Sequence, residues 1–120
     1  MGNKVLICED EKEARELLSV ILKKNNLEIY TAVDGKEAIE KTEEISPDLI
    51  VLDIRMTKID GLEVAKRIRR FNTTVKIIIL SGFASPELTK EAAKYDICDY
   101  IVKTSSVKDI LKVVQNAIKE

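Results

Sequence analysis

The chain has 120 residues, enough for one domain with a single hydrophobic core and too few for a second folded unit. Its 20 basic and 21 acidic side chains give a formal net charge of -1, which argues against DNA, RNA or an anionic lipid surface as the main ligand. No run approaches the roughly 20 apolar residues of a membrane span, and the N-terminus lacks a signal-peptide core. We therefore expect a cytoplasmic domain without membrane contact.

The chain contains no histidine and two cysteines. The missing histidine removes that residue as a general base, a phosphocarrier or a member of a catalytic triad. Metal sites built on Cys and His spacings are also absent. Cys8 and Cys98 lie within or beside apolar runs, and we interpret both as buried small hydrophobes. Carboxylate chemistry is what remains.

Short apolar runs alternate with segments of helical periodicity along the whole chain. The runs predict β-strands at residues 4–8, 28–32, 49–53, 76–81 and 100–102. The third and fourth runs are almost wholly apolar, which is typical of strands covered on both faces in a parallel sheet. The second run alternates like an edge strand.

The segments between and after the runs predict five amphipathic helices. The first covers about residues 11–24, and its expected core-facing residues are Ala14, Leu17, Leu18, Ile21 and Leu22. The second begins at Asp34, an N-cap that forms a capping box with Glu37, and it ends near Ile45.

The remaining helices carry similar signals. The third runs from about residue 60 to residue 71, and its expected buried residues are Leu62, Val64, Ala65 and Ile68. Ser85 and Pro86 give the fourth helix an N-cap and an N1 proline. Ser106 and Asp109 form a second capping box, which opens the fifth helix at residues 107–118.

This alternation predicts an α/β fold of the (βα)5 type, a doubly wound parallel sheet with flavodoxin-like topology. The expected strand order is 2-1-3-4-5, with right-handed crossovers and a topological switch between the first and third strands. We find no repeat, linker or low-complexity segment, so residues 1–120 form one domain.

Acidic residues follow two of the predicted strands. Glu9 and Asp10 come directly after the first strand, and Asp53 ends the third. Because these strands are predicted neighbours, their carboxyl ends place the acids together, and such a cluster stays ionised only when a cation or solvent compensates. Mg²⁺ is the natural candidate. We expect Asp10 and Asp53 to bind it directly, Glu9 to act through water, and the backbone carbonyl of Arg55 to add a ligand.

Ser81 and Lys103 end the fourth and fifth strands, so both emerge at the same edge of the sheet as Asp53. A hydroxyl donates to a phosphoryl oxygen, and an ammonium places a positive charge on it. Phosphoryl transfer depends mostly on positioning and charge neutralisation, which this set supplies. Asp53 is then the nucleophile that carries the phosphoryl group as an acyl phosphate.

In this order and spacing, these acids with Ser81 and Lys103 resemble the receiver domains of two-component response regulators over the whole length of the chain. The resemblance extends to Met56 and Asp60-Gly61 after the acceptor and to Tyr100 before the lysine. It implies an Asp53 phosphorylated by a histidine kinase, a phosphotransfer protein or a small phosphodonor, with Mg²⁺ required and dephosphorylation self-catalysed.

The resemblance also implies a switch. Ser81 and Tyr100 are expected to shift together on phosphorylation and to remodel the face made by the fourth helix, the fifth strand and the fifth helix. That face would meet a downstream target or output domain, or a second copy in a phosphorylation-dependent dimer. In receiver domains the positions of Arg55 and Phe83 flank the path of the attacking water, and because both side chains are bulky we expect slow hydrolysis.

Two residues depart from the family pattern. Thr57 replaces a common proline, which removes a fixed φ from the loop after the acceptor. Thr104 follows Lys103 where the family has a proline with a cis bond. A cis bond before a non-proline residue costs about 2.5–4 kcal/mol, so we expect the Lys103-Thr104 peptide to be trans.

Other classes fit less well. A haloacid-dehalogenase-like phosphatase needs an acid two residues after its nucleophile, where this chain has Arg55, and no cap domain fits in this length. A flavodoxin-like cofactor carrier is disfavoured because the acidic loop after the first strand repels a flavin phosphate. A receiver-like interaction module that is never phosphorylated stays as the alternative. No enzyme acting on an external substrate is expected.

Overall fold

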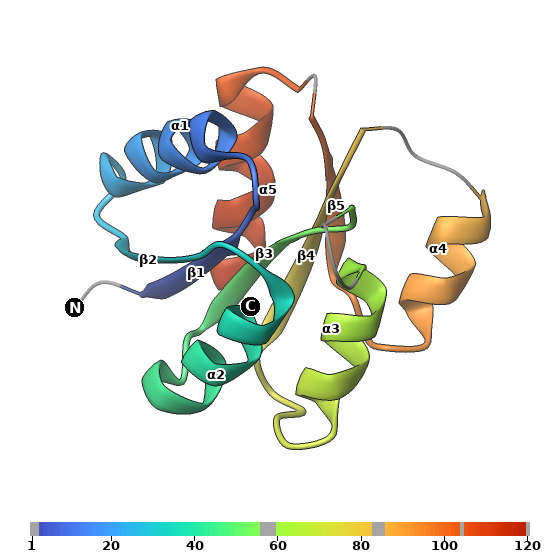
Figure 1. The fold of residues 1–120 in the computed structure, drawn as a ribbon. Coiled ribbons are helices and arrows are strands. Elements are labelled where there is room, and N and C mark those ends of the chain that lie inside the picture. The colour runs from blue at the N-terminus through green and yellow to red at the C-terminus, as the bar shows by residue number, and fades with distance from the viewer. Residues whose placement is uncertain (1–2, 56–59, 83–85, 104, 120) are drawn as a thin grey trace.

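A computed structural model of the chain describes residues 3–55, 60–82, 86–103 and 105–119. Strands and helices alternate without exception in this part of the chain (Figure 1). The strands are β1 (Lys4–Cys8), β2 (Glu28–Ala32), β3 (Leu49–Asp53), β4 (Lys76–Ser81) and β5 (Asp99–Val102). The helices are α1 (Lys12–Lys23), α2 (Gly35–Ile45), α3 (Gly61–Arg69), α4 (Pro86–Ala93) and α5 (Val107–Lys119).

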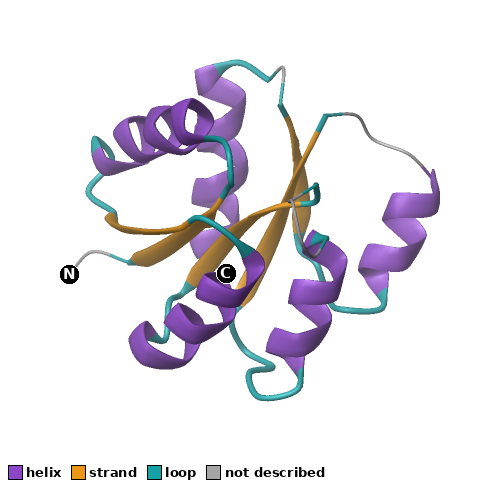
Figure 2. Cartoon of the chain, in the orientation of Figure 1, coloured by secondary structure: helices purple, strands orange, loops and turns teal. Residues whose placement is uncertain are grey.

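All strand pairs are parallel, and the sheet order is β2-β1-β3-β4-β5, which confirms the predicted fold (Figure 2). Every residue of β3 is buried, as its apolar run predicted, whereas β2 lies at an edge and stays partly exposed. β1 and β3 are neighbours although α1, β2 and α2 separate them in sequence. The direction in which the chain adds strands to the sheet therefore reverses between β1 and β3. The carboxyl ends of these two strands lie side by side.

The core has two layers, one on each face of the sheet. Helices α1 and α5 cover one face, and α2, α3 and α4 lie on the other (Figure 1). Alternate strand residues feed the two layers: Val5, Ile7 and Val51 pack with α1 and α5, while Leu6 and Leu52 pack with α2 and α3. No helix among the described residues is long and apolar enough to cross a bilayer.

Helix N-caps support the predicted starts. Asp34 accepts a hydrogen bond from the Glu37 amide at 2.9 Å, and the Glu37 carboxylate accepts one from the Val33 amide at 2.8 Å. The Asp109 amide donates to the Ser106 hydroxyl at 3.2 Å. These contacts satisfy amides that would otherwise lack partners at the first turn.

Several details of the sequence reading were wrong. Leu17 is 61% exposed because it is turned by about 100° from Leu18 and falls outside the buried stripe of α1. Leu62 is only partly buried. Cys98 is exposed because it precedes β5, an edge strand that begins one residue earlier than predicted, at Asp99.

Other predicted residues lie outside the part of the chain that the structure describes. They are Met56, Thr57, Phe83, Ser85 and Thr104. The Lys103-Thr104 peptide is among the features left undescribed, so its isomer stays a prediction.

Candidate functional site

The acidic residues converge at the carboxyl edge of the sheet. Asp53 is the last residue of β3, and Glu9 and Asp10 are the first residues after β1. Each of the three offers a carboxylate oxygen, and these oxygens all lie within 4.8 Å of one another. Glu9 is 0% exposed and Asp53 is 1% exposed, whereas Asp10 is exposed. The cluster is therefore buried at its base and open to solvent at Asp10.

Lys103 spans two of these acids. Its Nζ lies 3.1 Å from Asp53 Oδ2 and 3.4 Å from Glu9 Oε1, although it follows them in the chain by 50 and 94 residues. The Lys103 amide donates to the Ser81 carbonyl at 2.7 Å, which extends the pairing of β4 with β5 and directs the lysine toward the acids. Burial alone lowers the pKa of Lys103, but hydrogen bonds and charge from Asp53, with Glu9, outweigh it and raise the pKa.

Glu9 is buried and only partly paired. Its Oε2 is buried and has no hydrogen-bond partner among the described residues. Burial, followed by the hydrogen bond and charge of Asp53, raises the pKa of Glu9 to about 8, although Lys103 opposes this shift. The Glu9 and Asp53 carboxylates share the Lys103 ammonium, and each of the three acids offers a carboxylate oxygen to the cluster. A hard cation such as Mg²⁺ fits this donor set.

Ser81 and Arg55 border the acceptor. Ser81 ends β4 next to β3 and is buried at 4% exposure, so it lies at the same edge as Asp53. The Arg55 amide donates to Asp53 Oδ1 at 3.1 Å, while the Arg55 side chain is exposed. The Ile54 amide donates to the Leu80 carbonyl at 3.0 Å, which continues the β3–β4 pairing past the acceptor.

Gly61 lets the start of α3 lie against the backbone of Asp53 and Ile54. The sequence analysis singled out this residue only through the family resemblance. A Cβ on this residue would lie 2.5 Å from the Asp53 carbonyl oxygen and 2.8 Å from the Ile54 Cα. The Gly61 amide donates to the Ile54 carbonyl at 2.8 Å. Only glycine allows this approach, because any side chain would push the loop or the helix away.

Tyr100 lies on β5 and is partly buried against the core layer that contains α3. Its hydroxyl donates to the Thr89 carbonyl of α4 at 3.4 Å. The ring therefore connects β5 with α4. Its predicted coupling to Ser81 stays a prediction.

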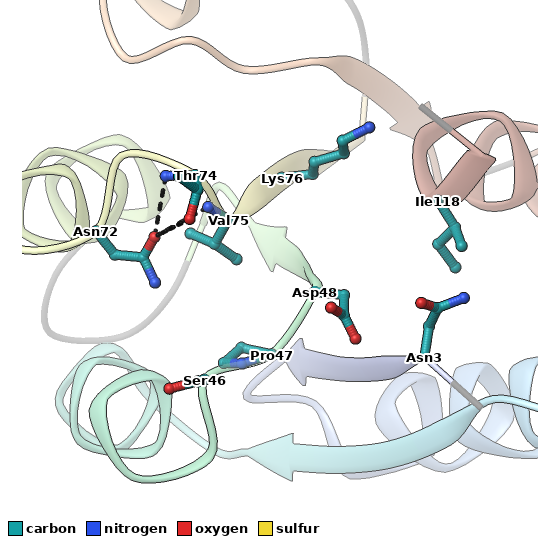
Figure 3. Close-up of a pocket in the computed structure, with 9 residues that line it drawn as sticks. All are labelled: Asn3, Ser46, Pro47, Asp48, Asn72, Thr74, Val75, Lys76 and Ile118. Carbon is teal, nitrogen blue, oxygen red and sulfur yellow. Dashed lines mark hydrogen bonds between the residues drawn. The ribbon is translucent and has the colours of Figure 1, made fainter. Parts of the chain in front are cut away.

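Hollows in the described surface also occur away from the acids. One, of about 360 Å³, lies at the amino ends of β1, β3 and β4, and Asp48, Asn72 and Lys76 are among the residues that line it (Figure 3). It is at the opposite edge of the sheet from Asp53 and takes no part in the acidic site.

Known proteins are similar to this chain over nearly its whole length. A family model described as the response regulator receiver domain matches residues 5–115. The chain is 32% identical over 120 residues to the chemotaxis protein CheY of Thermotoga maritima, covering 99% of this chain and 100% of CheY. It is 30% identical over 117 residues to the regulatory protein AtoC of Escherichia coli, covering 98% of this chain and 25% of AtoC. The chain thus spans all of one relative and a quarter of another.

Solved structures share the fold. The chemotaxis protein CheY4 of Vibrio cholerae superimposes with a TM-score of 0.90 at 29% identity, covering 98% of this chain and 99% of that one. The response regulator protein TrrA of Thermotoga maritima, solved in complex with Mg²⁺ and BeF, gives a TM-score of 0.86 at 33% identity. That match covers 96% of this chain and 98% of TrrA.

Proposed function

The chain belongs to the family of response regulator receiver domains, and we propose that it accepts a phosphoryl group on Asp53 and transmits this state to a partner through a change of surface. Receiver domains are signalling modules of two-component systems and not enzymes for external substrates. In the proposal the phosphoryl donor is a histidine kinase, a phosphotransfer protein or a small molecule such as acetyl phosphate.

One observation carries the proposal. The buried Asp53 carboxylate shares its edge of the sheet with two further acids, yet Lys103 is the ammonium that pairs with Asp53 and Glu9. Burying a carboxylate oxygen without a partner costs free energy of folding, so binding of a positively charged group is favoured at this place. This favours a site for a cation and a phosphoryl group over an ordinary solvated loop.

Each residue has a role in the proposal. Asp10 and Asp53 would hold Mg²⁺, with Glu9 acting through water and the Arg55 carbonyl as a further ligand. When bound, the ion neutralises negative charge on the donor phosphate and on the carboxylates. Ser81 and Lys103 contact phosphoryl oxygens, the first as a hydroxyl donor and the second as a positive charge.

The chemistry is an in-line displacement at phosphorus. An Asp53 oxygen forms the new P–O bond while the P–N bond of a phosphohistidine, or the anhydride P–O bond of acetyl phosphate, breaks and its electron pair leaves with the donor. In the reverse half of the cycle, water attacks the phosphorus and the Asp53 carboxylate leaves. Both steps need the acceptor held still, which burial and the Arg55 amide contact support.

Intact mass after incubation with acetyl phosphate and Mg²⁺ tests the proposal. We expect a gain of one phosphoryl group in the wild type and none in Asp53→Asn, and we expect beryllofluoride to bind only when Mg²⁺ is present. Phosphate retained on another residue, or beryllofluoride binding undiminished by EDTA, would contradict the assignment of Asp53. Failure to phosphorylate the wild type under any donor would favour an unphosphorylated interaction module.

The proposed output is a shift of Ser81 and Tyr100 that remodels the face made by α4, β5 and α5. The contact of Tyr100 with the Thr89 carbonyl supports it, because a ring that moves must release or change this contact with α4. We expect amide exchange and chemical shifts in residues 85–103 to change on beryllofluoride binding, with smaller changes in α2. Changes confined to the phosphate ligands would exclude the switch and leave the acceptor assignment intact.

The partner that reads this face is also part of the proposal. CheY of Thermotoga maritima matches along its full length, whereas AtoC continues far beyond the matched region. A separate target protein, an attached output domain and a phosphorylation-dependent dimer are therefore all consistent with the receiver role. We place the domain in the cytoplasm, where a kinase partner would meet it.

A further inference from the structure

Arg15 lies beside the acidic site but is not one of the groups discussed so far. It is in the first turns of α1 and is partly buried. Its Nη1 donates to the Glu9 backbone carbonyl at 2.9 Å. Within the described part of the chain this is the one hydrogen bond of the Arg15 side chain, and no carboxylate there forms an ion pair with it. The guanidinium thus contacts backbone beside a cluster of acids.

The Glu9 carbonyl belongs to the peptide that joins Glu9 to Asp10. A hydrogen bond to this carbonyl restrains ψ of Glu9 and φ of Asp10 together, because the peptide unit is planar. On the other side, the Glu9 amide donates to the Ala32 carbonyl at the end of β2, at 3.2 Å. Both polar atoms of the Glu9 backbone are therefore held, one by β2 and the other by Arg15.

This restraint acts directly on Asp10, because Asp10 follows the restrained peptide. Glu9 and Asp53 are enclosed by the core, but Asp10 is exposed, so packing does not fix its position. The helix start offers little help, because the N-cap residue Glu11 makes no side-chain capping hydrogen bond. The loop from Glu9 to Glu11 is thus anchored by Arg15 in the place where other helices of this protein use a cap.

We propose that Arg15 is a positioning residue for the metal site: it fixes the peptide between Glu9 and Asp10 and so sets the distance of the Asp10 carboxylate from that of Asp53. The inference rests on the proposed function, since it concerns Mg²⁺ at that site. Partners that orient metal ligands typically change affinity by 10–100-fold, so Arg15→Met should weaken Mg²⁺ binding to the unphosphorylated protein about tenfold.

Charge acts in the opposite direction, which makes the sign of the effect decisive. Removing a cation near an acidic cluster strengthens cation binding when electrostatics alone matters. Lys12→Met is the matched control, because Lys12 starts the same helix two residues after Asp10 and its side chain is 77% exposed, with Glu16 as its ion-pair partner at 4.0 Å. We expect Lys12→Met to bind Mg²⁺ as tightly as the wild type or more tightly, and Arg15→Met to bind it more weakly.

The experiment is a Mg²⁺ titration followed by amide chemical shifts, with urea unfolding of the same samples. A second control, Asn25→Ala, removes a 2.9 Å contact with the Ile21 carbonyl at the far end of α1 and should lower stability without changing Mg²⁺ affinity. Arg15→Met should also speed exchange of the Asp10 and Glu11 amides. Unchanged or tighter Mg²⁺ binding by Arg15→Met would overturn the proposal.

Two further outcomes keep the proposal separate from other failures. If the wild type itself binds no Mg²⁺, the proposed function fails, whereas equal affinities of wild type and Arg15→Met overturn only the role of Arg15. The wild type also reports on the contact directly: NMR of the Arg15 guanidinium should show hindered rotation about its Nε–Cζ bond. Free rotation would overturn the proposal even if Arg15→Met did not fold.

Discussion

The carboxyl ends and the amino ends of the strands form two opposite edges of the sheet. Polar groups at these two edges differ in how fully they are hydrogen-bonded. At the carboxyl edge, Glu9 keeps a buried oxygen without a partner among the described residues, and it shares Lys103 with Asp53. At the amino edge, Arg69 donates to the carbonyls of Tyr95, Asn72, Val75 and Asp96 at 2.8, 3.2, 2.6 and 3.1 Å. Among the described residues, the carboxyl edge keeps a buried oxygen without a partner, whereas the Arg69 guanidinium at the amino edge bonds to four carbonyls of the protein.

Side chains in the loops at the amino edge also form hydrogen bonds with nearby residues. Asn72 Oδ1 accepts from the Thr74 amide and hydroxyl and from the Val75 amide, at 3.0, 3.2 and 2.9 Å (Figure 3). Asp48 accepts from the Lys4 amide at 2.8 Å. Hydrogen-bonded loops of this kind stabilise the fold, whereas a cluster of like charges opposes folding. Substitutions at the two edges should therefore change stability and Mg²⁺ affinity in different combinations.

The largest effect is expected from Gly61→Ala, which adds a Cβ within 2.5 Å of the Asp53 carbonyl oxygen. The nearest atoms belong to the backbone of Asp53 and Ile54, which cannot rotate away as a flexible side chain could. We therefore expect a loss of about 2–3 kcal/mol in the free energy of unfolding together with slower phosphorylation of Asp53. Urea denaturation and phosphorylation by acetyl phosphate measure the two effects. Gly82→Ala is the control, since its Cβ would meet nothing within 4 Å. Equal stabilities of the two variants would contradict the close approach.

Arg69→Met should affect the amino edge alone. It leaves carbonyls of the loop between α3 and β4 and of the segment after α4 without their donor, and we expect about 2 kcal/mol of lost stability. Mg²⁺ affinity of the folded protein should stay at the wild-type value, because the acids are at the opposite edge. Arg70→Met, at the exposed neighbouring position, should change stability by less than about 0.5 kcal/mol. A matching loss in Arg70→Met would show that charge, not hydrogen bonding, is responsible.

Glu9→Gln should raise the free energy of unfolding, whereas the two preceding substitutions lower it. Because the pKa of Glu9 is raised to about 8, folding at neutral pH must either bury its charge or take up a proton, and glutamine avoids both, so the metal-free protein should gain about 1 kcal/mol of stability. Mg²⁺ should then bind more weakly, and added Mg²⁺ should raise the unfolding midpoint less than in the wild type. Glu11→Gln, an exposed acid two residues away, is the control. A destabilised Glu9→Gln would show that Lys103 already compensates the charge.

Sequence patterns predicted the fold well where burial is two-sided. β3 and β4 are apolar except at their ends, because helices cover both of their faces, so their runs stand out from the rest of the chain. The edge strand β5 begins with a charged residue, Asp99, and its start was placed one residue late. Cys98 was misjudged for the same reason, since an apolar neighbourhood in sequence does not distinguish a covered strand from an edge.

The acidic site was predictable because strand ends bring its residues together. Asp53 ends a parallel strand and Glu9 and Lys103 directly follow two others, so knowledge of the strand order suffices to place them at one edge. The contacts of Arg15 and Arg69 were not predictable in this way. Each is a long side chain that donates to backbone carbonyls, and a carbonyl is present at every residue, so the sequence carries no matching partner to search for.

The smallest expected effect concerns the lifetime of the phosphorylated state. The Arg55 side chain is exposed beside the acceptor while its amide holds Asp53 Oδ1, so a substitution there changes the bulk near the phosphoryl group and keeps the backbone contact. If bulk slows the approach of water, Arg55→Asn should speed loss of phosphate by a factor of about three to five, which is less than about 1 kcal/mol in the barrier. Arg55→Met keeps much of the bulk and removes the charge, so it should lose phosphate at the wild-type rate. The wild type should keep its phosphate for minutes or longer. Intact mass over time after removal of the phosphodonor gives these rates. If Arg55→Met accelerates as much as Arg55→Asn, the guanidinium charge controls hydrolysis, and if neither changes the rate, access of water at this position is not limiting.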